Sequence, residues 1–294
     1  MDGHVHQYLA NLQTSEAQAE ATTYLLSQQV QTMEAFLFGR QTAQQAAESL
    51  TRAVVDATTP FDTDDRMRAL WSFINMTAVG IPGKQDQVIQ LLRTIRTLPP
   101  LKVPKEGYGT GWVFLEDDEA WSQLPNWAND WADSINHFEN CFFDGYPGQS
   151  QEQGISDWNA AVSYSARLSN TRDTELVGDW FFLLRSLACV VRVLDVEPGQ
   201  HCENIKRELR AAVQIFIHAA AQVLERSKAE DKLIAIALHV EKPELTWNSD
   251  LYKLSLERWA HWKNRWAILK SRVELNQKER ELVDLALNAM NRVE

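Results

Sequence analysis

Hydrophobic residues recur at helical spacing along most of the chain, and turn residues separate the segments. Met67, Leu70, Trp71 and Ile74 show the i, i+3, i+4, i+7 spacing that puts apolar side chains on one helix face. Proline and glycine clusters interrupt the pattern. The predicted helices cover residues 7–56 (two helices, with a break near 38–42), 62–80, 85–99, 116–143 (with a break at 125), 156–168, 173–194, 202–226, 231–240, 250–272 and 277–292.

Helix-start signals and the absence of strand patterns set the fold class. Pro60 is expected to end the N-terminal helices, and Asp62, Thr63 and Asp64 offer N-caps for the next helix. No segment alternates polar and β-branched residues over a strand length. We therefore expect an all-α protein without a sheet.

The longer loops do not resemble domain linkers. Aromatic residues flank both residues 100–115 and residues 144–154. The sequence contains no repeat and no low-complexity tract. We expect one all-α domain over residues 1–294, a helical bundle on which the N-terminal helices of residues 1–60 pack.

The composition is that of a globular protein with an excess of tryptophan. Hydrophobic residues make up 45% of the 294 residues and aromatic residues 10%, with eleven Trp. Disordered chains are poor in both classes. Wide, flat, apolar side chains can pack a core or line a pocket for a hydrocarbon ligand.

The net charge of −11 excludes several function classes. Nucleic-acid binders usually show a basic stripe, and this chain has none, so we expect no nucleic-acid partner.

The three cysteines form no CxxC, and their odd number favours a reducing compartment. No signal-peptide pattern and no membrane-length apolar run occur, so we expect a cytoplasmic protein without membrane contact.

Residues 126–140 carry the most informative pattern in the chain. On a helix they divide into a polar face with Asn126, Asn129, Asp130, Asp133, His137 and Asn140, and an apolar face with Trp127, Trp131, Ile135 and Phe138. Asp130 and Asp133 are three residues apart, so their carboxylates point the same way and repel. Mg²⁺ favours oxygen ligands and leaves positions for water and phosphate, so Asn129, Asp130 and Asp133 form a candidate metal site. A solvated polar face is the alternative, and spacing alone favours it.

A second polar line lies on the next predicted helix. Asn159, Ser163 and Arg167 follow one another at i, i+4 and i+8. Asn and Ser oxygens could bind a second metal ion, and Arg could bind a phosphate group through two hydrogen bonds. A surface or capping role explains the same residues equally well.

A third segment with similar spacing has a simpler explanation. Ser249 or Asp250 is a natural N-cap for the helix that follows, and Lys253 and Glu257 form an ordinary i,i+4 pair. The seven histidines form no catalytic arrangement with serine, aspartate or cysteine.

Aromatic and small residues offer two candidate walls for a cavity. Trp259, Trp262 and Trp266 share one face of a predicted helix, which is typical of a core. In the last helix, Leu285 and Ala289 leave room for a ligand and could line a substrate pocket. Trp131 and Phe138, on the apolar face of the 126–140 helix, are the other expected pocket residues.

The chain resembles a fungal family of helical proteins of unknown function that occurs near secondary-metabolite clusters. The resemblance covers the chain from about residue 70 onward. It rests on Leu70-Trp71 with Ile74, Gln85–Pro99, Trp158-Asn159, Ala166-Arg167-Leu168, Arg258-Trp259-x-x-Trp262-Lys263 and the helix of Met290.

Within that family, the chain resembles the fungal α-humulene synthases of tropolone-sesquiterpenoid (xenovulene-type) pathways. The resemblance rests on size, tryptophan content and Asn129-Asp130-x-x-Asp133. It implies a class I terpene cyclase fold, an Mg²⁺ cofactor, and conversion of farnesyl diphosphate to a macrocyclic sesquiterpene. Asn129, Asp130 and Asp133 match the first metal motif, and Asp130 and Asp133 would be catalytic. Asn159 and Ser163 match part of the second motif, but Arg167 replaces its closing Glu.

Two other functions stay open beside the terpene cyclase. A non-catalytic helical interaction protein would have the acidic face exposed and every Trp stripe in the core. A metal-independent tailoring enzyme would keep its activity in EDTA. A homodimer is compatible with each. Candidates for binding the diphosphate are Arg167, Arg185, Arg192 and Lys206.

Overall fold

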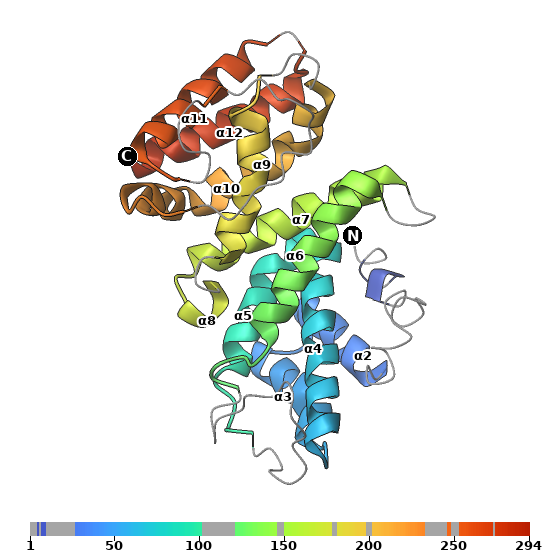
Figure 1. Cartoon of the computed structure of the whole chain (residues 1–294). Helices are drawn as coiled ribbons and strands as arrows, with labels where there is room; N and C mark the ends of the chain where they lie inside the picture. The colour runs from blue at the N-terminus through green and yellow to red at the C-terminus, as the bar shows by residue number, and fades with distance from the viewer. Residues whose placement is uncertain are drawn as a thin grey trace. The chain divides into compact units, whose positions relative to one another are not determined.

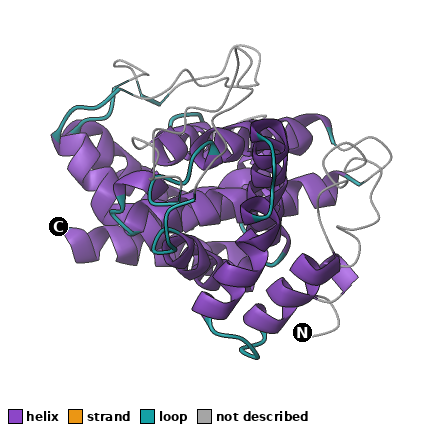
Figure 2. Cartoon of the chain, turned by 90° about the horizontal axis from the view of Figure 1, so that it is seen from below, coloured by secondary structure: helices purple, strands orange, loops and turns teal. Residues whose placement is uncertain are grey.

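The described part of the protein is helical, as expected. The computed structural model describes residues 5, 7–9, 27–101, 121–145, 150–177, 181–197, 202–232, 246–247, 253–272 and 274–294. Within these ranges the regular structure consists of helices, without a strand (Figure 2). Lys232 and Lys253 form an isolated antiparallel bridge. The prediction of an all-α protein is therefore confirmed.

The chain divides into two compact units, Met1–Ser134 and Ile135–Glu294. In Figure 1 they run from blue to green and from green to red. Helix α6 (Trp127–Asp144) contributes its first half to the first unit and its second half to the second. The expected single domain over residues 1–294 stays a prediction.

The first unit is built around α3, which packs against α2, α4 and α5. The predicted break near residues 38–42 is confirmed: Gly39 has a φ of 71°, and Thr42 begins α3 with a capping box to Gln45. The elements are α2 (Ser27–Leu37), α3 (Ala43–Val55), α4 (Pro60–Gly80), η2 (Pro82–Lys84) and α5 (Gln85–Ile95).

The start of α4 differs from the prediction. The helix begins at Pro60, and the side chain of Thr59 caps it by accepting a hydrogen bond from the Asp62 backbone N–H. Asp62, Thr63 and Asp64 lie inside the helix and are not its N-cap. Proline is well tolerated in the first helical turn, because that turn does not need its missing N–H. Pro60 therefore starts this helix instead of ending the previous segment.

In the second unit, α10 contacts α7, α9, α11 and α12. Helix α7 begins five residues earlier than predicted, and the predicted helix 173–194 consists of two described elements on either side of residues 178–180. The elements are α7 (Gln151–Asn170), α8 (Thr174–Val177), α9 (Phe181–Leu194), α10 (Cys202–Lys228), α11 (Leu256–Lys270) and α12 (Gln277–Val293). Most of the predicted helix 231–240 lies outside the described residues.

Helix α11 begins later than predicted. Its N-cap is Ser255, whereas Ser249 and Asp250 lie outside the described residues. Lys253 precedes the helix, and its ammonium group donates to Glu230 at 2.6 Å. Lys253 and Glu257 therefore do not form the predicted i,i+4 pair on one helix, because the chain at Lys253 is not yet helical. A hydrogen bond with Ser255 lowers the pKa of Glu257 most, and the charge of Lys253 also contributes to lowering it.

The tryptophan stripe of α11 belongs to the core of the second unit. Phe216 of α10 lies 5.9, 6.2 and 5.9 Å from the rings of Trp259, Trp262 and Trp266. All three indoles are buried, which confirms that this stripe packs the core. No described helix is long and apolar enough to cross a bilayer.

Candidate functional site

The first half of α6 presents the two faces that the sequence predicts. Trp127 and Trp131 are fully buried, whereas Asn129 and Asp133 are exposed. Asp130 lies between these extremes and is half-buried. An acidic residue in the first turn of a helix is favoured by the helix dipole, so its presence alone indicates no function. Its burial requires a separate explanation.

The turn before α6 holds residues in the left-handed region. Leu124 has a φ of 47° and Asn126 a φ of 61°. Asn tolerates this conformation, whereas for Leu it costs about 1–2 kcal/mol. The indole N–H of Trp71 donates to the Pro125 carbonyl at 2.8 Å, and the Trp127 N–H donates to the Leu124 carbonyl at 3.0 Å. The first bond joins the turn to α4, and the second closes the turn itself in spite of the strain.

A buried asparagine holds the carboxylate of Asp130. The amide group of Asn75, on α4, donates to Oδ2 of Asp130 at 2.7 Å. The indole N–H of Trp127 donates to Oδ1 of Asn75 at 3.1 Å. Because Asn75 is fully buried and its oxygen is engaged by Trp127, its N–H groups face Asp130. The orientation of Asp130 is thus set by a chain of two hydrogen bonds.

The environment of Asp130 opposes its ionisation. Burial raises the pKa of Asp130 to about 6 from 3.8, the hydrogen bond from Asn75 lowers it, and the nearby charge of Asp133 raises it further. Arg68 has a smaller, lowering effect. A desolvated carboxylate beside a second carboxylate is typical of sites that bind a cation or transfer a proton.

A second polar group lies on α4 in the same unit. Asp64 pairs with Arg68 at 2.9 Å, and the amide group of Asn126 lies 3.5 Å from its Oδ1. The side chain of Asp64 is 12% exposed, and burial raises its pKa. The side chain of Arg68 is 51% exposed. The structure therefore brings a carboxylate and a solvent-accessible cation of α4 near the Asp130 end of α6.

The oxygen donors at this site fit Mg²⁺ better than a transition metal. Among the described residues, no three His, Cys, Asp or Glu side chains group closely enough to hold a metal by themselves. Mg²⁺ commonly binds one or two protein carboxylates and completes its shell with water and substrate phosphate. Asp130 and Asp133 meet that smaller requirement, and the exposed Asn129 lies beside them.

The second predicted line lies in the other unit, on α7. The hydroxyl group of Ser163 lies 3.2 Å from Oε1 of Gln214, which in turn lies 3.1 Å from Nε2 of His218. The side-chain oxygen of Asn159 is buried and has no hydrogen-bond partner among the described residues. Ser163 is thus already engaged with α10, whereas the Asn159 oxygen is available as a ligand. Arg167 is half-buried.

Two of the predicted diphosphate-binding arginines lie in a buried cluster of charges. Arg192 donates to Glu139 at 2.9 Å and to Glu208 at 2.7 Å, and Arg185 also pairs with Glu139. Burial raises the pKa of Glu208 to about 7 although Arg192 lowers it. Both arginines are therefore paired with carboxyl groups of their own unit.

Sequence reasoning missed Asn75 and the two glutamates of this cluster. Arg185 and Arg192 are seven residues apart in an otherwise apolar helix, which was a signal for buried ion pairs. Asn75 gave no such signal, because a single asparagine in a helix reveals neither its burial nor a partner more than fifty residues away.

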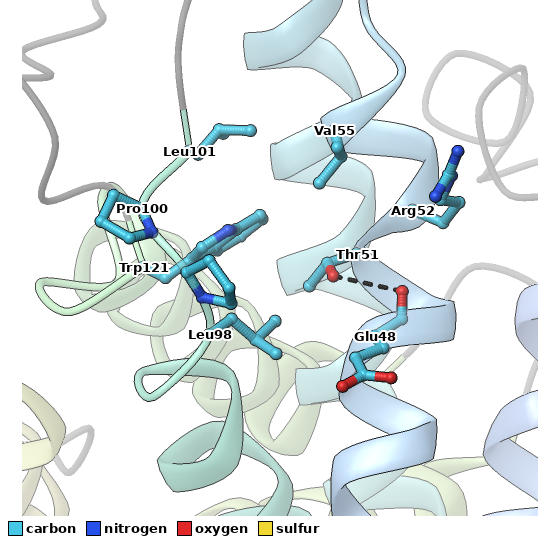
Figure 3. A pocket seen from close by; sticks show the side chains of 9 residues that line it. Glu48, Thr51, Arg52, Val55, Leu98, Pro100, Leu101 and Trp121 are labelled. Carbon is cyan, nitrogen blue, oxygen red and sulfur yellow. Dashed lines mark hydrogen bonds between the residues drawn. The ribbon is translucent and has the colours of Figure 1, made fainter.

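The expected pocket residues occupy different environments. Trp131 and Phe138 are fully buried, Ala289 is half-buried, and Leu285 is 46% exposed. None of the four lines the cavity shown in Figure 3, which lies in the first unit near Trp121. Their role in binding a substrate stays a prediction.

Comparison with known proteins gives a family and no activity. No curated protein and no solved structure matches the chain significantly. One family profile matches residues 71–266, which is more than half of the 294 residues and includes Asn75, Asp130 and Asp133. The chain therefore belongs to this family, described as a protein of unknown function (DUF3632).

Proposed function

We propose that this protein is a magnesium-dependent class I sesquiterpene cyclase. It would convert farnesyl diphosphate to a macrocyclic sesquiterpene, α-humulene, and release diphosphate. The observation that carries the proposal is the half-buried carboxylate of Asp130, which Asn75 orients one turn from Asp133. A desolvated carboxylate destabilises the fold, and strongly perturbed carboxyl groups are typical of functional sites.

Each polar residue of this site has a proposed role. Asp130 and Asp133 would hold Mg²⁺ with Asn129 beside them, and Asn75 would orient Asp130. Bound Mg²⁺ would supply positive charge that stabilises the leaving diphosphate. The exposed guanidinium group of Arg68 would donate hydrogen bonds to diphosphate oxygens.

The remaining predicted residues would assist ionisation of the substrate and closure of the ring. The C1–O bond breaks, the distal double bond attacks C1 to close the ring, and a proton leaves to diphosphate. Aromatic side chains stabilise carbocations without attacking them, which is the role proposed for Trp131 and Phe138. Asn159 and Ser163 are proposed to bind further metal and Arg167 to bind diphosphate.

Incubation with farnesyl diphosphate tests the proposal. The full-length protein is mixed with the substrate in Mg²⁺ or in EDTA, and extracted hydrocarbons are analysed by gas chromatography–mass spectrometry. A sesquiterpene that forms only with Mg²⁺ supports the cyclase. No hydrocarbon under either condition rejects it, and turnover that survives EDTA indicates a metal-independent tailoring enzyme.

Core packing favours a second candidate, a non-catalytic helical interaction protein. The Trp259, Trp262 and Trp266 stripe is fully used in packing against Phe216. This candidate predicts no metal-dependent change in the protein. Addition of Mg²⁺ with inorganic diphosphate would then give no binding heat in calorimetry, whereas the cyclase predicts saturable binding.

A further inference from the structure

A cavity of about 540 Å³ lies in the first unit, between α3 and the residues that follow α5 (Figure 3). Its volume is within the range of pockets that bind small molecules. Its lining includes none of the residues that hold Asp130, so it is distinct from the candidate active site.

The opposing walls of this cavity are apolar. Val55 of α3 and Leu101 point toward each other across it, and the indole of Trp121 reaches toward α3 between them and Leu98 (Figure 3). Val55 is 48% exposed, whereas Leu98, Leu101 and Trp121 are buried against the protein. An apolar body between these walls would cover Val55, which stabilises binding by about 25 cal/mol per Å² of apolar surface removed from water.

The ring of Trp121 is held in place from behind. It packs edge to face with Trp71, with ring centroids 6.3 Å apart and an angle of 88° between the planes. Such aromatic pairs are worth about 0.5–1.5 kcal/mol beyond their buried area. This wall is therefore already ordered before a ligand arrives, which reduces the entropy lost on binding.

Two charged side chains line this cavity, and among the described residues Arg52 has an ion pair whereas Glu48 has none. The guanidinium group of Arg52 pairs with Asp56 at 2.8 Å and points away from Trp121 (Figure 3). The hydroxyl group of Thr51 donates to the Ala47 carbonyl. Glu48 accepts one hydrogen bond, from Gln44 at 2.7 Å, and a carboxylate can accept about four.

The geometry points to a binding site for a hydrophobic ammonium ion, with its apolar body between Val55, Leu101 and Trp121 and its cation beside Glu48. A negatively charged ligand would meet Glu48 and a chain of net charge −11. A cation would instead be attracted by the carboxylate. This inference does not depend on the terpene cyclase proposal.

Two cage compounds of equal shape and opposite charge test the site. Isothermal titration calorimetry compares binding of 1-adamantylammonium and adamantane-1-carboxylate to the full-length protein. We expect saturable binding of the ammonium ion at least ~5-fold tighter than that of the carboxylate, as for an exposed charge pair of about 1 kcal/mol. Absence of saturable binding of both compounds overturns the site, and equal affinities overturn the assigned charge.

Matched variants connect the binding to Glu48. Glu48→Gln should remove the preference for the ammonium ion. Glu281→Gln is the control, because Glu281 is an exposed helical carboxylate that likewise accepts from a Gln one turn earlier, Gln277, at 3.0 Å. Val55→Trp should fill the cavity and weaken binding at least ~10-fold, while the far-ultraviolet circular dichroism stays unchanged. Unchanged binding in Glu48→Gln or in Val55→Trp contradicts the proposal.

Discussion

Replacing Asp130 with asparagine should stabilise the protein at neutral and alkaline pH. The asparagine oxygen can accept the same hydrogen bond from Asn75, but it carries no charge to desolvate. Burial raises the pKa of Asp130 from 3.8 to about 6, and at about 1.4 kcal/mol per pKa unit this corresponds to ~3 kcal/mol. Relaxation of the surrounding structure and the partial exposure of Asp130 reduce the effect. We therefore expect Asp130→Asn to raise the unfolding free energy by about 1–3 kcal/mol.

The gain should depend on pH in a defined direction. The folded-state pKa of Asp130 lies above its unfolded value, so folding favours the protonated acid. Below about pH 3.8 the carboxyl group is protonated in the folded and the unfolded protein, so no charge has to be desolvated on folding. The wild-type protein then loses stability as the pH rises through 6. The difference between Asp130→Asn and wild type should therefore be about a third of its full value at pH 4.5 and reach the full value by pH 7–8.

Urea denaturation followed by circular dichroism at pH 4.5, 6, 7 and 8 measures this difference. Asp133→Asn is the matched control, since Asp133 is exposed on the same helix and its replacement should change the unfolding free energy by a few tenths of a kcal/mol. If Asp130→Asn is no more stable at pH 8 than wild type, or if its gain is the same at all four pH values, the reasoning about desolvation is refuted.

Two further predictions concern the second unit. A Cβ on Gly154 would lie 2.3 Å from the Cys141 carbonyl oxygen, so Gly154→Ala should lower the unfolding free energy by about 1–3 kcal/mol or more. Gly83 has open space around it, so Gly83→Ala is the control and should leave the unfolding free energy unchanged. Equal effects of the two substitutions in urea titrations would contradict the close approach. The pKa of Glu208 is raised to about 7, so the stability that its protonated form contributes is lost as the pH rises from 4.5 through 7. In thermal unfolding experiments, Glu208→Gln should lose less stability than wild type over that interval. Parallel pH profiles of the two proteins would show that Arg192 keeps Glu208 ionised throughout.

Helix positions were largely predictable from periodicity because most helices are amphipathic and have local end signals. The break before α3 was predicted correctly, where Thr42 and Gln45 form a capping box within four residues. The start of α4 was predicted incorrectly, because a proline such as Pro60 is compatible with two positions: after the end of one helix or in the first turn of the next. Only the hydrogen bond from the Asp62 N–H to Thr59 decides between them.

The candidate site was predictable only in part. The spacing of Asp130 and Asp133 placed both on the polar face of one helix, and their positions follow from sequence alone. The burial of Asp130 does not, because it depends on Asn75, which lies 55 residues earlier in the chain. Contacts between distant segments are set by tertiary packing, so no local pattern could reveal that one aspartate is desolvated and the other is not.

The rate of diphosphate release from farnesyl diphosphate by Asp130→Asn tests the central claim most directly. The measurement is made at pH 8 in Mg²⁺, beside wild type, with folding of both proteins checked by circular dichroism. We predict a variant that is more stable than wild type and whose rate falls by about 10²–10³-fold, as for the loss of one group that stabilises developing charge. A wild-type rate in the folded variant would contradict the role of Asp130.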